Sequence, residues 1–456
     1  MSAHPLPARG LDYRTVWRWH FYAGLLCIPF VLWLAATGSI YLFKPQIEAW
    51  LDRSYDHLST DGPRASPQAI ATAALAAVPE SVLNAYELPP TDAAAVRVLV
   101  GHGDRLVRVY VHPRTLAVLK VVDEDERPMH VVFRLHGELM LGDRGSMLVE
   151  LAASWTILML LSGLWLWWPR DRAGLGGVLY PRLAGGGGRR FWRDLHAVTG
   201  VWVSMFALFL LFSGLPWAKS WGGMLKSVRS LGDAAVVRQD WTTGRSSELA
   251  GRRAANAAPA GGHEHHSGPA DPSAPHDYAA LDRLVPLVAA QGLAAPVLIA
   301  PPSRASASWN ARSDTPNRPL RANLVLDGSR ATVLERTGFD QRPLLDRIVG
   351  VGVAAHEGQL FGLANQLLGA FTAFGLVAVS LSAVVMWWTR RRRGVLGAPP
   401  AQAARRLSWP FLALVTTFAI LLPLFGASLL AMLALERGVL RRSPRAAAFL
   451  GLRAAN

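Results

Sequence analysis

The sequence is poor in cysteine and in charged residues. Cys27 is the only cysteine among 456 residues, so neither a disulfide framework nor a thiolate metal site can form within one chain. Charged residues make up 17% of the chain, against 51% apolar residues. Acidic residues are the scarcer charge, with 32 Asp and Glu against 47 Lys and Arg. This composition is typical of an integral membrane protein.

Five apolar stretches are long enough to cross a membrane. Each has 20 or more residues, and at about 1.5 Å per helical residue that length crosses a hydrocarbon layer of roughly 30 Å. The first stretch has charged and aromatic flanks and no clear cleavage site, so we expect a retained helix rather than a signal peptide. The stretches are Trp19–Phe43, Met147–Trp168, Phe191–Trp217, Gly362–Trp388 and Trp409–Leu435.

The arginines are concentrated in three segments next to these stretches. They precede the first stretch, fill the loop between the second and third, and follow the fourth as Arg390 to Arg393. The positive-inside rule therefore predicts that these segments are cytoplasmic and that the two long loops are periplasmic. Topology and anionic membrane lipid account for the net charge of +15, so no nucleic-acid partner is expected.

The fifth stretch is an exception to this rule. A fifth crossing would export a tail that carries Arg437, Arg441, Arg442 and Arg445, and Pro423 interrupts the middle of the stretch. We expect a fifth apolar helix there, with a re-entrant or interfacial segment as the alternative.

Both long loops show the same order of helical and strand patterns. A helix near Ser66–Val78 precedes strands near Val96–Val100, Leu106–Val111 and Val118–Val122. The second loop has a helix near Tyr278–Gln291, then strands near Val297–Ala300, Ala307–Ala311 and Ala322–Leu334, the last broken by a turn at Asp327-Gly328. A low-complexity insert at about 242–275 is expected to be disordered.

The predicted fold class is an α-helical membrane protein with two repeats of helix, periplasmic α+β module and helix, plus the fifth apolar helix. The predicted segments are 1–43 with the first span; 44–135, module 1; 136–168, an interfacial segment and the second span; 169–190, a cytoplasmic loop; 191–217, the third span; 218–355, module 2; 356–388, the fourth span; 389–408, a cytoplasmic loop; 409–435, the fifth span; and 436–456, a tail.

A histidine-led pattern occurs twice in the chain. Placing an ionisable side chain at the start of a membrane helix costs free energy, so a repeated histidine at this position indicates a function. The first set, His20, Gly24 and Gly38, recurs 176 residues later as His196, Gly200 and Gly214; the second, His136, Gly142 and Trp167-Trp168, recurs 220 residues later as His356, Gly362 and Trp387-Trp388.

These histidines are candidate cofactor ligands, and a family resemblance described below implies that the cofactor is haem. Two axial ligands of one iron must be about 4 Å apart, so His20 and His136, on opposite faces, cannot share one. Across the repeats, His20 can pair with His196 inside and His136 with His356 outside. We expect Gly24 and Gly200 to leave room for the macrocycle, and Arg14 and Arg190 to offer propionate partners. Arg18, Arg193 and Arg134 are further candidates, and topology alone also explains the arginines.

Simpler interpretations remain open for each histidine. His20 lies among Trp17, Trp19 and Tyr22, which also suit an aromatic belt at the membrane interface. His136 must lie on a surface segment broken near Gly142, and His130 is a spare outer candidate. A cluster in the low-complexity insert could capture a metal weakly, although solvated sequence is the simpler interpretation: His263, His265, His266 and His276.

Several short motifs accompany the histidine pattern along the chain. They are Leu135-His136-Gly137, Ser162-Gly163-Leu164-Trp165, Trp167-Trp168-Pro169, Asp194-Leu195-His196 with Gly200 and Ser213-Gly214, His356 with Gly358 and Gly362, and Pro423 to Leu429. With these motifs the chain resembles the PepSY-associated transmembrane family of bacterial inner-membrane proteins. The resemblance covers nearly the whole chain, and the chain departs from a paired-serine pattern at Ala36-Thr37-Gly38 and Ser382-Ala383. The resemblance implies haem b, here two haems, and electron transfer to a ferric siderophore or ferric chelate, whose iron is released as Fe(II).

No cytoplasmic nicotinamide or flavin domain is evident in the sequence. No Gly-rich dinucleotide fingerprint follows a strand, and the predicted cytoplasmic loops are short. Electrons would therefore come from quinol or from a separate cytoplasmic reductant. A non-enzymatic alternative is that the helices anchor modules that bind a periplasmic peptide or protein. A permease is disfavoured, because the spans hold few polar residues.

Overall fold

The computed structural model describes residues 13–169, 174–182, 188–230, 278–302, 308–399 and 409–452. The chain divides into two compact units. The helical unit comprises Met1–Ile40, Leu135–Val237 and Leu367–Asn456, and the sheet unit comprises Tyr41–Arg134 and Arg238–Gln366. The predicted insert at 242–275 lies outside the described residues.

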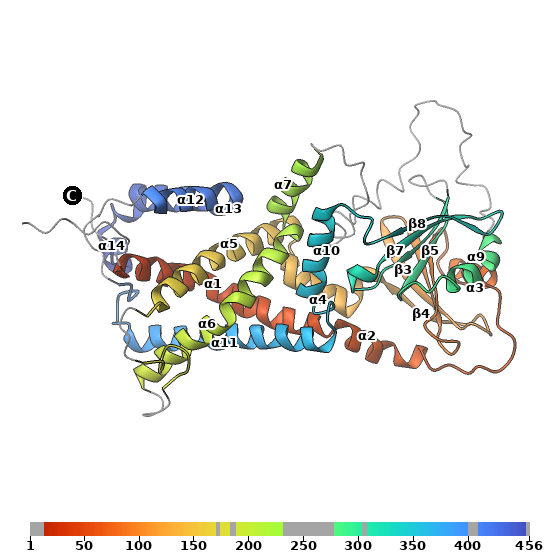
Figure 1. The fold of residues 1–456 in the computed structure, drawn as a ribbon, viewed down its shortest axis with the longest axis horizontal. Coiled ribbons are helices and arrows are strands. Elements are labelled where there is room, and N and C mark those ends of the chain that lie inside the picture. The colour runs from red at the N-terminus through yellow and green to blue at the C-terminus, as the bar shows by residue number, and fades with distance from the viewer. Residues whose placement is uncertain are drawn as a thin grey trace, which may run out of the picture. The chain divides into compact units, whose positions relative to one another are not determined.

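Four long helices confirm the first four predicted spans (Figure 1). Each is apolar along nearly its whole length and has the length needed to cross a bilayer. A further candidate, Pro423–Leu440, brings the number of such helices in the described residues to five. The protein is therefore a helical membrane protein. The four long helices are α1 (Tyr13–Leu42), α5 (Gly142–Trp167), α6 (Arg189–Gly214, continued by the short helix η3, Leu215–Trp217) and α11 (Leu363–Arg390).

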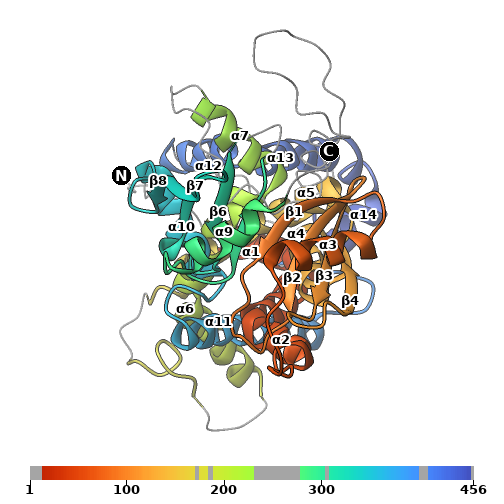
Figure 2. The ribbon, with the colours of Figure 1, turned by 90° about the vertical axis from the view of Figure 1, so that its right-hand side faces the viewer.

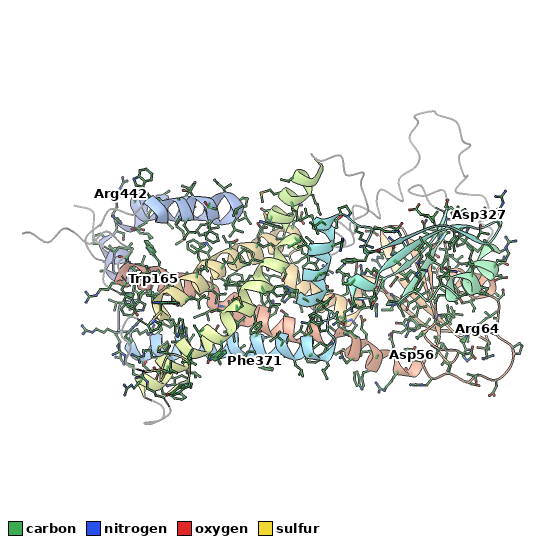
Figure 3. All side chains as sticks on the ribbon, in the orientation of Figure 1. Asp56, Arg64, Trp165, Asp327, Phe371 and Arg442 are labelled. Atoms are coloured by element: carbon green, nitrogen blue, oxygen red, sulfur yellow. The ribbon has the colours of Figure 1, made fainter. Side chains whose placement is uncertain are left out.

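Large apolar side chains project from the surface of this unit. Phe371, labelled in Figure 3, is 53% exposed on α11, and Phe374 on the same helix is 69% exposed. Leu430, near the end of the chain, is 70% exposed. An apolar surface of this kind is favourable in lipid and unfavourable in water, which agrees with a membrane location.

The helix that carries His136 is short and separate from the following span. α4 (Pro128–Glu138) ends where Leu139 and Met140 adopt positive φ values of 50° and 58°. Gly142, with φ of 58°, then begins α5. The predicted break before the second span is confirmed, and it lets His136 lie on a different axis from α5.

The fifth apolar stretch is not the single helix that was expected over 409–435. It is divided at Leu422 into α12 (Trp409–Leu421) and α13 (Pro423–Leu435), which contact each other. The break arises because Pro423 lacks an amide hydrogen and its ring clashes with the preceding turn. At 13 residues, α12 is about 20 Å long, shorter than a hydrocarbon layer of roughly 30 Å. α13 runs directly into the π-helical turn η6 (Glu436–Leu440), and the two together have 18 residues. α14 (Pro444–Leu450) follows.

The sheet unit is built on one antiparallel sheet of eight strands, in the order β4-β3-β2-β1-β5-β6-β7-β8. All strands expected from the sequence are present, but β1 was missed because a bulge between Leu83 and Ala85 interrupts its alternation. The strands are β1 (Val82–Glu87), β2 (Val96–His102), β3 (Arg105–Val111), β4 (Val118–Asp123), β5 (Val297–Ala300), β6 (Trp309–Ser313), β7 (Ala322–Asp327) and β8 (Thr332–Gly338).

The two predicted modules share this sheet. β1 of the first pairs with β5 of the second, with Tyr86 opposite Ile299. α3 (Pro67–Ala77) and α9 (Ala280–Ala289) lie side by side on one face (Figure 2), where Ile70, Leu284 and the inward strand residues form a single apolar core. The modules therefore fold as one domain rather than as two independent ones.

The opposite face of the first four strands carries charged residues. Arg108 lies between Glu87 and Glu124, with its Nη1 2.5 Å from Glu87 Oε2. Burial acts to raise the pKa of Glu124, but Arg108 and Arg127 outweigh it and lower that pKa below its usual value. These charges neutralise one another within the domain.

A second group on this face is contributed by the segment that follows α1. Arg97 contacts Asp56, labelled in Figure 3, at 2.8 Å and Asp52 at 3.4 Å. Tyr110 donates a hydrogen bond to Asp52, and burial, followed by the charge of Asp52, raises its pKa to about 12. The short elements that bring these residues to the sheet are α2 (Lys44–Asp52) and η1 (Arg53–Tyr55), with η2 (Glu124–Glu126) beside Arg108.

Gly145, in the first turn of α5, provides a test of the packing between α4 and α5. A Cβ atom at this position would lie 1.6 Å from the carbonyl oxygen of Glu138, a backbone atom that cannot move aside easily. Gly145→Ala should therefore destabilise the helical unit by roughly 1–3 kcal/mol, measured as a lower melting temperature of the purified protein in detergent.

The matched control is Gly223→Ala in α7 (Lys219–Ser230), where nothing lies within 4 Å of the added Cβ. Removing a helical glycine there should be neutral or stabilising by about 0.5–1 kcal/mol. Equal melting temperatures for the two variants would contradict the described packing.

Candidate functional site

The two histidines predicted to pair at the inner face lie next to each other. His20 on α1 and His196 on α6 have ring centroids 6.3 Å apart and ring planes at 82°. Both rings are largely enclosed by the helices of this unit, and residues 176 positions apart in the chain are brought together. The structure thus brings together the inner pair that the sequence pattern predicts.

The separation of these rings suits two ligands of a single iron. Two metal–nitrogen bonds of about 2 Å and two ring radii of about 1 Å place the ring centres roughly 6 Å apart. Rotation of either ring about its bond to the metal leaves the distance between the ring centres unchanged. The near-perpendicular ring planes are therefore compatible with two imidazoles that bind one iron. The residues present therefore fit axial ligation of a haem.

Each of these histidines is held through Nδ1 by a carbonyl group of a neighbouring helix. Nδ1 of His20 lies 3.0 Å from the Met159 carbonyl on α5, and Nδ1 of His196 lies 3.0 Å from the Val379 carbonyl on α11. A carbonyl can only accept, so Nδ1 carries the hydrogen and Nε2 keeps its lone pair. Histidines that bind metals usually donate their other ring nitrogen to an acceptor in this way.

A serine hydroxyl lies beside the Nδ1 atom of each histidine, and the two serines occupy equivalent positions in the two repeats. Ser162 Oγ lies 3.1 Å from His20 Nδ1, and Ser382 Oγ lies 3.4 Å from His196 Nδ1. Val379 and Ser382 stand 220 positions after Met159 and Ser162. The repeat found in the ligands therefore extends to the groups that orient them.

His136 is held in a similar way at the other end of α1. Its Nδ1 lies 3.0 Å from Thr37 Oγ1, and a Cβ on Gly38 would lie 3.1 Å from its Cε1. In the same way, a Cβ on Gly163 would lie 3.0 Å from Cε1 of His20. A hydroxyl residue followed by glycine thus supports a histidine at both positions, a role that sequence reasoning did not assign to these dipeptides.

The inner and outer positions are far apart along α1. Thr37, which contacts His136, is 17 residues after His20, or about 25 Å along the helix axis. This separation excludes a common iron for His20 and His136. His356 is the last residue of α10 (Leu344–His356) and belongs to the sheet unit, so its pairing with His136 stays a prediction.

The predicted glycines have packing or backbone roles in the structure. A Cβ on Gly24 would lie 3.8 Å from Met159 Sδ, and one on Gly200 would lie 4.0 Å from Val379 Cγ2. Gly24 therefore faces α5, whose Met159 carbonyl holds His20, and Gly200 faces α11, whose Val379 carbonyl holds His196. Gly142 and Gly362 have φ values of 58° and 57°, and nothing lies within 4 Å of an added Cβ at either, so backbone conformation explains them.

The arginines proposed as propionate partners differ in their surroundings. Arg14 and Arg190 are exposed in the first turns of α1 and α6, each six residues before its histidine. Arg18 instead donates to the carbonyls of Pro399 and Gly451. Arg134, two residues before His136, has a buried Nε without a hydrogen-bond partner among the described residues. Arg14, Arg190 and Arg134 are thus available to an acidic group.

Asp194 connects the short loop before α6 to the turn that carries His196. It is 1% exposed, and it accepts hydrogen bonds from Nε and Nη2 of Arg182 at 2.6 and 2.9 Å and from Arg193. The hydrogen bonds to Asp194 raise the pKa of Arg182. Arg193, a further predicted propionate partner, is therefore already paired with Asp194.

The buried acid of the second span has a structural partner. Glu150 on α5 is 2% exposed, and its carboxylate oxygens accept from the amides of Ser220 and Trp221 at 2.8 and 3.1 Å. These amides belong to the first turn of α7, where helix N–H groups lack intrahelical partners. An acidic residue within a span usually indicates function, but here capping explains it.

The remaining histidines do not extend the site. His130 lies 3.5 Å from Asp125 in the sheet unit. The predicted weak metal cluster, His263, His265, His266 and His276, lies outside the described residues.

The fold and the inner histidine pair define a class of membrane protein in which two helix pairs, α1 with α5 and α6 with α11, meet at paired imidazoles. Residues 17–390 match the profile of the PepSY-associated TM region, and the chain belongs to this family. The resemblance inferred from the sequence is thereby confirmed. No curated protein matches the chain.

Replacing Asp194 tests whether this residue anchors the inner end of α6. Asp194→Asn removes the charge that four side-chain nitrogens of Arg182 and Arg193 contact. We expect a loss of about 1–3 kcal/mol, seen as a lower melting temperature in detergent. Glu436→Gln removes the exposed pair with Arg441 and should change stability by less than about 1 kcal/mol. A larger effect at Glu436 than at Asp194 would refute the anchoring role.

Proposed function

We propose that this protein is a haem b-containing inner-membrane reductase that passes electrons across the membrane to a periplasmic ferric siderophore or ferric chelate, which then releases Fe(II). The observation that carries the proposal is the pair His20 and His196, 6.3 Å apart, each with Nδ1 bonded to a carbonyl. This arrangement leaves two Nε2 lone pairs as ligands.

The surroundings of the pair support a haem rather than a metal held by protein ligands alone. Two imidazoles supply the axial ligands of a haem, whereas zinc sites require three or four protein ligands. Arg14 and Arg190 lie one to two turns before the histidines and are exposed, as propionate partners should be. Haem, when bound, supplies reversible one-electron chemistry between Fe(II) and Fe(III).

The protein's own residues favour electron transfer over oxygen chemistry. His20 and His196 would occupy both axial positions, so no coordination site remains for a small molecule. The carbonyls of Met159 and Val379 hold the rings in one tautomer and orientation, which limits reorganisation when the charge changes. A second pair, His136 with His356, would form the outer centre and set the direction of transfer.

The direction of transfer follows from the arginine distribution. Arg390 lies over the rings of Trp17 and Phe21, so the end of α11 and the start of α1 share one face of the bundle. The positive-inside rule makes this face cytoplasmic and makes the sheet unit periplasmic. Electrons from quinol or a separate cytoplasmic reductant would enter at His20 and His196. The acceptor would be reduced by one electron per ferric ion at the periplasmic face.

An absorption spectrum of the purified protein tests the cofactor. We expect a reducible b-type haem spectrum with about two haems per chain, and His196→Ala should lose one haem, because only one ligand pair is broken. His102→Ala, at an exposed strand end, is the matched control and should keep both. Retention of both haems in His196→Ala would remove the inner pair. A colourless, folded wild-type protein would favour the non-enzymatic anchor.

Reoxidation of the reduced protein tests the acceptor. Dithionite-reduced protein, freed of excess reductant under anaerobic conditions, should be reoxidised by a ferric siderophore, with one Fe(II) trapped by a colorimetric chelator for each haem oxidised. The gallium(III) complex of the same siderophore has the same shape but accepts no electron, so it should leave the haems reduced. Haems that stay reduced with every ferric chelate tried would exclude this acceptor class.

A further inference from the structure

The end of the described chain is bonded to the beginning of α1. Arg18 donates to the Gly451 carbonyl at 2.9 Å, and the Tyr22 hydroxyl donates to the Leu450 carbonyl. The Leu396 amide, in the segment after α11, donates to the Phe449 carbonyl at 2.8 Å. These contacts place α14 at the same end of the helical unit as the start of α1 and the end of α11.

A single atom of Arg18 joins both ends of the C-terminal apolar segment. Arg18 Nη1 donates to Pro399 O, before α12, at 2.7 Å and to Gly451 O, after α14, at 2.9 Å. These two carbonyls therefore lie within about 6 Å of each other. A segment that crossed a hydrocarbon layer once would end roughly 30 Å from its starting point.

The turn between α12 and α13 is buried inside the helical unit. Leu422 and Phe425 at the turn are 3% and 1% exposed and pack with Ile157 of α5. Trp155 donates to Ser428 Oγ at 3.0 Å. Trp155 is 12 residues before the end of α5, or about 18 Å along the axis, so the turn lies well within the depth of the bundle.

Two backbone amides at this turn have acceptors within the hairpin. The amides of Leu422 and Gly426 donate to the carbonyls of Phe418 and Leu422, at 2.8 and 3.1 Å. A Cβ on Gly426 would lie 2.8 Å from the carbonyl oxygen of Ala419, so glycine allows the two helices to approach closely. Non-helical backbone at membrane depth requires such protection.

We infer that residues 409–450 form a re-entrant helical hairpin that enters the membrane from one face and returns to that face. α13 contacts both α12 and α5, and Figure 1 shows α14 at the end where α1 begins. The hairpin is a fifth membrane element but not a fifth crossing. Because Arg18 and Tyr22 flank His20 on α1, the same bonds hold the turn that carries this histidine.

The hairpin also removes the exception to the charge rule. The basic residues of the tail return to the face that carries Arg390 to Arg393, instead of being exported. Arg441 is paired with Glu436, and the others add positive charge beside the headgroups. The basic residues of the tail are Arg437, Arg441, Arg442 and Arg445.

Cysteine accessibility tests this topology without reference to haem. In a Cys27→Ser background, three exposed positions are replaced singly: Ala448→Cys in α14, Arg392→Cys after α11 and Thr91→Cys before β2. Intact spheroplasts and inside-out vesicles are treated with a membrane-impermeant maleimide. We expect positions 448 and 392 to be labelled in the same preparation, and position 91 in the opposite one.

Labelling of position 448 together with position 91, and not with position 392, would overturn the hairpin and establish a fifth crossing. A second measurement uses the double variant Leu396→Cys with Phe449→Cys, which should form a disulfide on mild oxidation because these residues are hydrogen-bonded neighbours. The pair Arg392→Cys with Thr91→Cys should not. Failure of the first pair to cross-link, in a protein that melts normally, would also overturn the inference.

Discussion

Polar groups of the helical unit at membrane depth need partners inside the protein, because hydrocarbon offers none. This constraint explains the contacts that hold the unit together. His20 reaches from α1 to the Met159 carbonyl of α5, and His196 reaches from α6 to the Val379 carbonyl of α11. Each imidazole therefore links the two helices of its own repeat through Nδ1. The pairing of the repeats through His20 and His196 then depends on both links.

The same constraint accounts for the other polar residues of the spans. Glu150 caps α7, Trp155 bonds Ser428 at the buried turn, and Arg18 joins the two ends of the C-terminal segment. Glu150 is informative, because an acid in a span suggests a proton path until its partners are known. Its two amide donors give it a structural role instead. The contacts of His20 and His196 differ from these, because they leave the Nε2 atoms of two neighbouring imidazoles for another partner, which is the physical reason for proposing a redox site there.

Much of the fold could be predicted from periodicity and length. The four spans and the strands β2 to β8 follow from apolar runs and alternation, and the pairing of His20 with His196 follows from the 176-residue repeat together with helix direction. β1 could not be predicted, because its bulge breaks the alternation. The roles of Thr37 and Ser162 were also missed, since a hydroxyl residue beside glycine in a span usually serves helix packing. Only the neighbouring imidazole distinguishes them.

The sequence by itself determined that this is a helical membrane protein with a duplicated histidine framework, because hydropathy and spacing are local properties that survive without knowledge of contacts. Only the tertiary structure decided that the two predicted modules share one sheet and that the two ends of the fifth apolar stretch lie next to each other. Both results depend on contacts between residues far apart in the chain. Tyr86 lies opposite Ile299, and Arg18 binds Pro399 and Gly451. No pattern along the chain encodes which distant carbonyl or strand edge will satisfy a given hydrogen-bond donor.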